Sequence, residues 1–431
     1  MLTGRRVRPN IATSRRGART RSIGMATFPT EIGAKTAPVM MEFGAKSKLA
    51  FVYQGIAVIL GVASALAALP MAVLCFGTYG MALLLGKIAP LRAGYDWASR
   101  GYDGVLERVG RKVLRDARDV PALRVMVSLT VTVVPIFVAQ LVLGKPRLLL
   151  VIAFYLALYG VKFQRFVRMF SAAHLEAHRK QGYFAGVYDK IFGRYLEFFL
   201  GFFYGNMPEL GRTAHVCLHH RENASAEDTR NSMAYDRTSR VDFLWYLSDN
   251  MWTVLGLAPY AYFKEHGDDK SRKRMLAGMA CYWAYFGAMF AYNWRIGIFY
   301  VLVPILCMNF VNAITAWVQH AFCDPANPED YFGNTVTVMD EENFMNEGYH
   351  LCHHHRSGMH WTEMPEHFER LRERMKQANS LVFRDLDFFG VFMELTLLRR
   401  IDVLAEKLVT WESMSHEERV ALLVERAGAR G

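Results

Sequence analysis

Long apolar stretches constrain the fold of this chain more than any other feature of its sequence. No charged residue occurs in the 38 positions from Leu49 to Gly86, and further apolar runs cover 122–144, 148–163, 276–293 and 296–317. One bilayer-spanning helix needs about 20 apolar residues. The first stretch therefore predicts two spans that join near Pro70. The later runs form two pairs, each divided by a very short polar link, which is typical of transmembrane hairpins.

These runs predict an all-α integral membrane protein with four to six transmembrane helices in hairpins. Hydrophobic residues make up 52% of the chain and charged residues only 21%, as expected for the membrane class. A further aromatic segment, 191–204, is too short to span and is expected in the interface or beside a lipid tunnel. Since each hairpin crosses twice, we expect 1–48, 87–121, 164–275 and 318–431 on one side of the bilayer.

Charge and composition divide the chain into three predicted regions. Residues 1–48 begin with an arginine-rich, acid-poor stretch that is typical of an organelle transit peptide or of a basic disordered tail. Residues 49–365 form the predicted membrane domain, and 366–431 read as amphipathic helices. The net charge of +11 fits the positive-inside rule, which places the basic side in the cytosol, matrix or stroma. No nucleic-acid motif accompanies it, so we expect no nucleic-acid partner.

Histidines gather in four places, and the predicted spans lie before and between them. The sequence contains HLEAH at 174–178, HVCLHH at 215–220, a single His320, and HLCHHH at 350–355. Neutral imidazole is the commonest metal-ligand side chain. Histidines at i and i+4 share one face of a helix, so pairs such as His174 and His178 can chelate one ion.

The number of histidines predicts two metal ions in a helical cap on the cytosolic side. Nine nitrogens exceed what one octahedral ion binds, and a nitrogen set without thiolates favours iron over structural zinc. The last cluster can be read as HxxHH, with His353 and His354, or as HxxxHH, with His354 and His355. We expect no catalytic residues beyond the ligands. Further ligands, or residues that orient the ligands, are His355, His360 and Glu347. The predicted metal ligands are His174, His178, His215, His219, His220, His320, His350, His353 and His354.

These clusters resemble the three histidine boxes of the membrane fatty acid desaturase superfamily, which includes lipid desaturases and alkane-type hydroxylases. The boxes match HLEAH, HVCLHH and HLCHH, and His320 matches the isolated ligand that follows a late span. The resemblance covers about residues 125–365. It implies a non-haem di-iron centre that activates O2 at the cytosolic face and acts on a fatty acyl or other long apolar substrate. The spacing of the second box is more familiar in alkane hydroxylases.

The predicted function is that of a fatty acid desaturase in lipid and fatty acid metabolism. A lipid or alkane-type hydroxylase is the alternative, since both reactions share the first hydrogen abstraction. A membrane metallohydrolase is a further alternative, although it needs fewer histidines. No HPGG-type haem-binding segment occurs in the sequence. Electrons are therefore expected from a separate ferredoxin or small cytochrome. The N-terminus indicates plastid or mitochondrion, whereas the superfamily resemblance also allows the endoplasmic reticulum.

Overall fold

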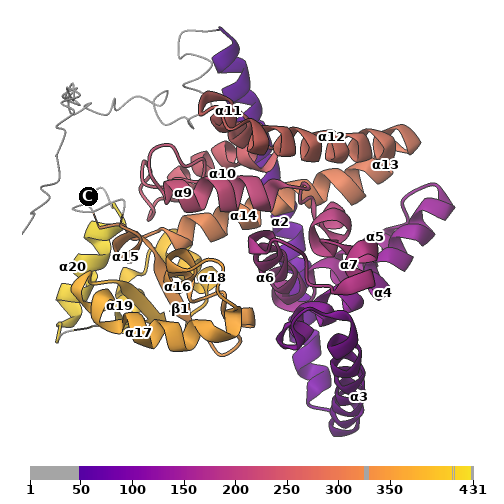
Figure 1. Ribbon diagram of the computed structural model, residues 1–431, viewed down its shortest axis with the longest axis horizontal. Coiled ribbons are helices and arrows are strands. Elements are labelled where there is room, and N and C mark those ends of the chain that lie inside the picture. The colour runs from indigo at the N-terminus through magenta and orange to yellow at the C-terminus, as the bar shows by residue number, and fades with distance from the viewer. Residues whose placement is uncertain (1–47, 325–329, 410, 412, 429–431) are drawn as a thin grey trace, which may run out of the picture. The chain divides into compact units, whose positions relative to one another are not determined.

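The computed structural model describes residues 48–324, 330–409, 411 and 413–428. Helices dominate this part of the chain, as the sequence predicts, and three short strands accompany them (Figure 1). Nearly all of the predicted N-terminal segment 1–48 lies outside the described residues. The longer helices are α2 (Lys48–Gly86), α3 (Ala89–Val113), α4 (Val120–Leu143), α5 (Leu148–Tyr159), α6 (Gln164–His178), α10 (Arg240–Val254), α12 (Asp269–Tyr292), α14 (Val303–Gln319) and α17 (Met364–Gln377).

Shorter helices connect these elements and build the C-terminal region. They are α7 (Gly186–Phe192), α8 (Gly201–Tyr204), α9 (His220–Glu222), α11 (Leu257–Glu265), α13 (Trp294–Gly297), α15 (Tyr331–Asn334), α16 (His350–His355), α18 (Phe388–Phe392), α19 (Ile401–Lys407) and α20 (His416–Arg426). Strand β1 (Val336–Met339) pairs in parallel with β2 (Leu381–Arg384), which pairs antiparallel with β3 (Leu408–Val409). The small sheet therefore joins the segment before the last histidine cluster to the region after residue 366.

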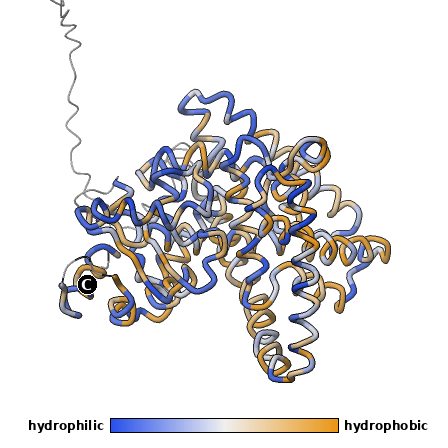
Figure 2. The backbone as a smooth tube through the Cα atoms, turned by 60° about the horizontal axis from the view of Figure 1, so that its bottom comes forward, coloured by the Kyte–Doolittle hydropathy of each residue, from blue (hydrophilic) through white to orange (hydrophobic). Residues whose placement is uncertain are grey.

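Four segments of the described chain are long and apolar enough to cross a membrane. They are Val52–Gly86, Ala117–Leu143, Leu148–His178 and Trp294–Gln319. The predicted 148–163 run thus continues into α6, and α12 is a helix that does not meet the criterion for a span. Hydrophobic residues are drawn in orange in Figure 2 and recur along many of its helices, whereas the segment that projects at the top is mostly blue. The membrane class and the lower end of the predicted range of spans are confirmed.

Helix α2 corrects one prediction. The stretch 49–86 forms one continuous helix with Pro70 inside it, not two spans that join there. Apolar surroundings offer no water to the backbone groups that a break would free, so a proline is tolerated within such a helix. At 1.5 Å per residue the helix is about 58 Å long, well beyond the ~30 Å hydrocarbon core. We expected the N-terminus and 87–121 on the same side of the bilayer because two spans were predicted between them. One continuous helix removes the basis of that expectation.

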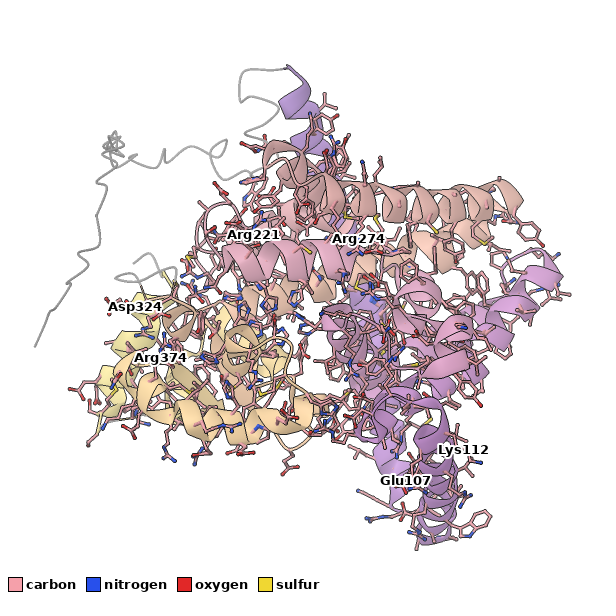
Figure 3. All side chains as sticks on the ribbon, in the orientation of Figure 1. Glu107, Lys112, Arg221, Arg274, Asp324 and Arg374 are labelled. Carbon is pink, nitrogen blue, oxygen red and sulfur yellow. The ribbon has the colours of Figure 1, made fainter. Side chains whose placement is uncertain are left out.

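The two later hairpins form as predicted and meet at their turns. Helices α4 and α5 turn at 144–147, and α12 turns at Asn293 into α13, which leads on into α14. The Asn293 side-chain amide donates to the carbonyl of Gly144 over 2.9 Å, which fixes the two turns together. Beyond α2, the amphipathic helix α3 carries Glu107 and Lys112 outward (Figure 3). An ion pair of 2.6 Å between Asp103 and Arg124 ties α3 to α4.

Buried polar side chains hold α2, α10 and α14 together. The Asn309 amide donates to the Ser64 hydroxyl over 3.1 Å and accepts from the Asn250 amide over 2.9 Å. Gly61 permits the close approach of α2 to α10, because a Cβ there would lie 2.3 Å from the Ser248 hydroxyl oxygen. Hydrogen bonds between helices in apolar surroundings fix their register. Helix α14, which ends next to His320, is therefore held firmly on this side.

Candidate metal centre

Three structural elements and one helix end carry the predicted ligands. Helix α6 presents His174 and His178 near its C-terminus. A π-helical turn at Gly211–His219 leads into α9, which begins at His220. Helix α16 consists of the last histidine cluster, and His320 follows the end of α14. π-Helical turns inside helices often occur at functional sites.

The nine histidines come together in two groups, each with its potential ligand atoms within 4.8 Å of one another. The five-histidine group comprises His174, His178, His215, His220 and His353. The four-histidine group comprises His219, His320, His350 and His354. The two groups are adjacent, since the rings of His220 and His354 stack with centroids 4.5 Å apart. HVCLHH and HLCHHH each contribute to both groups, whereas HLEAH and His320 each contribute to one.

The π-helical turn explains how HVCLHH is divided. Its wider winding brings residues i and i+5 to one face, so His215 and His220 approach with their Nε2 atoms 3.1 Å apart. His219, at i+4 from His215, joins the other group. The i, i+4 spacing of His215 and His219 therefore does not bring them into one group in this structure. In α16, the regular α-helical spacing does place His350 and His354 in one group.

The contacts within the groups fit a bound cation. Nε2 of His353 lies 2.9 Å from Nε2 of both His174 and His220. His174 donates its Nδ1 proton to Glu347, so its Nε2 carries a lone pair toward the group. Nε2 of His178 and of His354 is buried and has no hydrogen-bond partner among the described residues. Buried nitrogens of this kind are costly to leave unpaired. A metal ion within each group would satisfy them, and an all-imidazole donor set suits iron, copper or zinc.

Burial keeps the imidazoles in the protonation state that metal binding requires. Burial, reinforced by neighbouring imidazoles, lowers the pKa of His215, His220 and His350 well below the usual value. The same causes act on His353 and His354. Burial lowers the pKa of His320 to about 3. These side chains are therefore neutral at physiological pH, and a metal ion does not have to displace protons from them.

Three further residues orient the ligands through the opposite ring nitrogen. Glu347 accepts from Nδ1 of His174 over 2.7 Å, and Asp228 accepts from Nδ1 of His219 over 2.6 Å. The carbonyl of Asn334 accepts from Nδ1 of His320 over 3.0 Å. Such partners fix the tautomer and the ring orientation of a ligand. Glu347 was predicted from its position beside the last cluster. Asp228 and Asn334 were not, because no spacing pattern links them to the histidines.

His355 and His360 lie outside both groups. Nδ1 of His355 is 2.9 Å from Nε2 of His367, and Nε2 of His360 is 3.2 Å from a carboxylate oxygen of the buried Asp119. Of the two readings of the last cluster, the structure thus brings His353 and His354 to the centre and leaves His355 at its edge. His360 instead connects the segment after α16 to the start of α4.

A comparison with protein-family models finds that the model described as fatty acid desaturase matches residues 146–385. This range covers more than half of the chain and contains all nine histidines. The chain belongs to the fatty acid desaturase family. No curated protein and no solved structure matches it. Family membership and the apolar helices make this protein a membrane oxidoreductase of the desaturase and hydroxylase type, which acts on lipid with O2.

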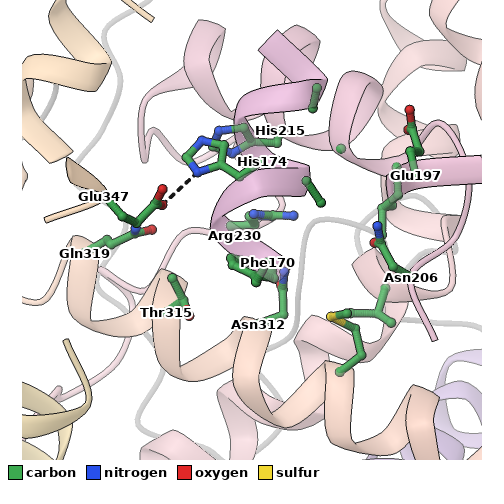
Figure 4. A pocket seen from close by; sticks show the side chains of 16 residues that line it. Phe170, His174, Glu197, Asn206, His215, Arg230, Asn312, Thr315, Gln319 and Glu347 are labelled. Atoms are coloured by element: carbon green, nitrogen blue, oxygen red, sulfur yellow. Dashed lines mark hydrogen bonds and ion pairs between the residues drawn. The ribbon is translucent and has the colours of Figure 1, made fainter. Parts of the chain in front are cut away.

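A cavity lies against the five-histidine group of this desaturase-family protein. His174 and His215 line it, together with apolar residues such as Phe170 and Leu210 and with polar residues from α14 and from the loop after α9 (Figure 4). A substrate that enters this cavity would come directly beside the metal-binding nitrogens. The cavity is therefore the candidate substrate site.

Proposed function

We propose that this protein is an O2-dependent di-iron oxidoreductase that introduces a double bond into a fatty acyl or lipid chain. The observation that carries the proposal is the pair of adjacent histidine groups within the span matched by the desaturase family model. Two iron ions, when bound, supply the activation of O2 and the removal of hydrogen. In this proposal all nine histidines are iron ligands, and His355 and His360 support the centre from outside.

The residues around the centre would position the substrate and keep out water. Glu347 and Asp228 hold the rings of His174 and His219, which prevents the ligands from turning away. Apolar side chains such as Phe170, Leu210 and Met308 line the cavity and would hold the acyl chain against the five-histidine group. Holding one C–H bond near the reacting centre supplies much of the rate enhancement in such a site.

Hydroxylation of a lipid is the second candidate. Three amide side chains, those of Asn206, Asn312 and Gln319, line the same cavity, and they would accommodate a hydroxylated product. The two reactions differ in their products. Desaturation removes two hydrogens from the lipid, whereas hydroxylation adds one oxygen atom. Mass spectrometry of lipids from cells that express the protein, compared with cells that express His354→Ala, distinguishes the two.

Electron supply and location complete the proposal. We propose a separate ferredoxin or small cytochrome as electron donor. The histidine groups face the cytosol, or the stroma or matrix if 1–48 directs the protein to a plastid or mitochondrion. Residues 49–365 then act as the catalytic membrane domain and 366–431 as a helical support beneath the centre. Reconstitution with each donor class, measured as lipid oxidation, tests the first point, and fluorescent fusions test the second.

Metal analysis of the detergent-purified protein is the decisive experiment. We expect two irons per chain in the wild type and loss of iron in His354→Ala and His219→Ala. His355→Ala is the matched control, since it removes a neighbouring imidazole outside both groups, and it should retain iron. One zinc per chain, or no metal in protein that keeps its helical circular dichroism, would contradict the di-iron proposal.

A further inference from the structure

We propose that the cavity beside His174 and His215 binds an oxygen-bearing part of the substrate through Arg230, so that the reacting carbon lies close to a hydroxyl, carbonyl or carboxylate group. This inference rests on the proposed function, because it names the substrate class for the same site. It predicts that the stretch of the lipid held against the five-histidine group lies next to an oxygen-bearing group, not far along an unsubstituted hydrocarbon chain.

The lining of the cavity is too polar for a hydrocarbon chain alone. Arg230, Asn206, Asn312 and Gln319 line it in addition to the apolar side chains. Asn312 is only 5% exposed, and its carbonyl oxygen has no hydrogen-bond partner within the described chain. Nε of Arg230 is likewise buried and unpaired as far as the structure describes the chain. Buried polar groups are normally hydrogen-bonded, so these atoms indicate a ligand that would pair with them.

The backbone around Arg230 is anchored while its side chain reaches into the cavity. Its N–H donates to Asp228 over 2.9 Å, and its carbonyl accepts from the Tyr246 hydroxyl over 2.9 Å. Figure 4 shows the guanidinium between His174 and Asn312, above Phe170. Asp228 holds both His219 and this backbone, so the second histidine cluster and Arg230 are positioned by one carboxylate.

Three acidic side chains near the cavity have hydrogen-bond or ion-pair contacts, although Oε1 of Glu197 is buried without a hydrogen-bond partner among the described residues. Glu197 pairs with Arg194 over 2.7 Å, and Glu347 accepts from His174. Asp228 accepts from His219 and from the backbone N–H groups of Ala224 and Arg230. The unpaired Nε–H of Arg230 is thus a donor, and it calls for an acceptor oxygen on the ligand. Arginine binds such oxygens with charge-assisted hydrogen bonds.

Photoaffinity labelling tests the inference without requiring turnover. Three diazirine probes of equal chain length would be used: a carboxylate, a primary alcohol and a hydrocarbon. Each is photolysed with full-length protein in detergent, and labelled peptides that contain Phe170 or Leu210 are quantified. We expect the carboxylate or alcohol probe to label these peptides at least about tenfold more than the hydrocarbon, as a charge-assisted hydrogen bond implies. A preference for the carboxylate over the alcohol identifies an anionic group, and equal labelling identifies a neutral oxygen.

Arg230→Met should abolish this preference, and Arg230→Lys should retain part of it. Arg221→Met is the matched control, because Arg221 is exposed and pairs with Glu222 away from the cavity. If the hydrocarbon labels as well as the oxygenated probes in the wild type, the inference is wrong, and this comparison needs no variant that could misfold. Absence of iron would refute the proposed function and leave the labelling result standing, so the two failures are distinguishable.

Discussion

Replacing Asp119 by alanine should destabilise the protein strongly and loosen two of the segments that carry ligands. Asp119 is fully buried just before α4. Its carboxylate accepts two hydrogen bonds from the Arg179 guanidinium, at 2.7 and 2.8 Å, and one from the Trp361 indole at 3.2 Å. His360 lies 3.2 Å from the same carboxylate. Arg179 directly follows His178, and His360 follows α16, so one side chain joins the first and last histidine clusters.

The expected loss follows from what the substitution leaves behind. Arg179, whose side chain is 23% exposed, would lose its carboxylate partner, and the about 3–5 kcal/mol that removing one partner of a fully buried ion pair costs is the upper bound of the loss. Asp116→Ala is the matched control. Asp116 lies three residues earlier and pairs with the exposed Arg118 over 2.7 Å. Asp116 also caps the following turn by accepting from the backbone N–H of Arg118, and it lies 3.8 Å from His360; because these contacts are exposed or long, the control should lose only about 1 kcal/mol. Asp119→Asn should fall between the two, since it keeps an acceptor oxygen and loses the charge.

Reversible unfolding in mixed micelles, followed by tryptophan fluorescence, measures the free energy of unfolding of each variant. Metal content is measured on the same samples. We expect Asp119→Ala to lower both quantities, and Asp116→Ala to lower the free energy of unfolding only slightly and to leave the metal content unchanged. If the two alanine variants unfold alike, Asp119 does not clamp these segments, and the reasoning from its contacts is refuted.

Three further predictions concern ligand orientation, packing and pH. Glu347→Ala should weaken metal binding about 10- to 100-fold in a chelator competition, whereas Glu347→Gln keeps an acceptor for His174 and should lose less. Gly205→Ala should lower the free energy of unfolding by at least about 1 kcal/mol, because φ is +73° and a Cβ would lie 2.5 Å from the Ile305 Cα; an unchanged midpoint would contradict this. The metal-free protein should lose stability as the pH falls from about 6.5 toward 3. In this range His320 takes up a proton in the unfolded chain but not in the folded protein, where burial lowers its pKa to about 3. A free energy of unfolding that does not change with pH would refute this linkage.

Local patterns in the sequence identified the candidate ligands, but they did not predict how the segments that carry these ligands come together. Spacing within HLEAH and HLCHHH follows regular helical geometry, so the shared faces of α6 and of α16 could be anticipated. The apolar runs likewise indicated the α4–α5 and α12–α14 hairpins. The prediction of two spans in 49–86 was wrong because it took Pro70 as a helix break. In water a proline inside a helix usually marks a break, whereas in apolar surroundings α2 continues across it.

Contacts between distant segments could not be predicted from local patterns. Asp228 contacts His219 from a loop, and no periodic pattern in the sequence predicts where that loop runs. Asn334 contacts His320 through its backbone carbonyl, so its side chain gives no signal in the sequence. Asp119 lies in an ordinary stretch before an apolar run, and its partners Arg179 and His360 are 60 and 241 residues away. The sequence indicates which histidines are candidate ligands, but the residues that hold them in place come together only in the tertiary fold.

The π-helical turn at Gly211–His219 shows how one local feature decides the composition of both metal groups. Regular α-helical winding would direct His215 and His219 to the same side and turn His220 away from His215. The wider turn instead pairs His215 with His220 and releases His219 toward His320 and His354. The extra residue per turn costs helix stability, and the hydrogen bond from His219 to Asp228 fixes the released side chain. One short segment therefore contributes to both groups, and the π-helical turn decides that His215 shares its group with His220 and not with His219.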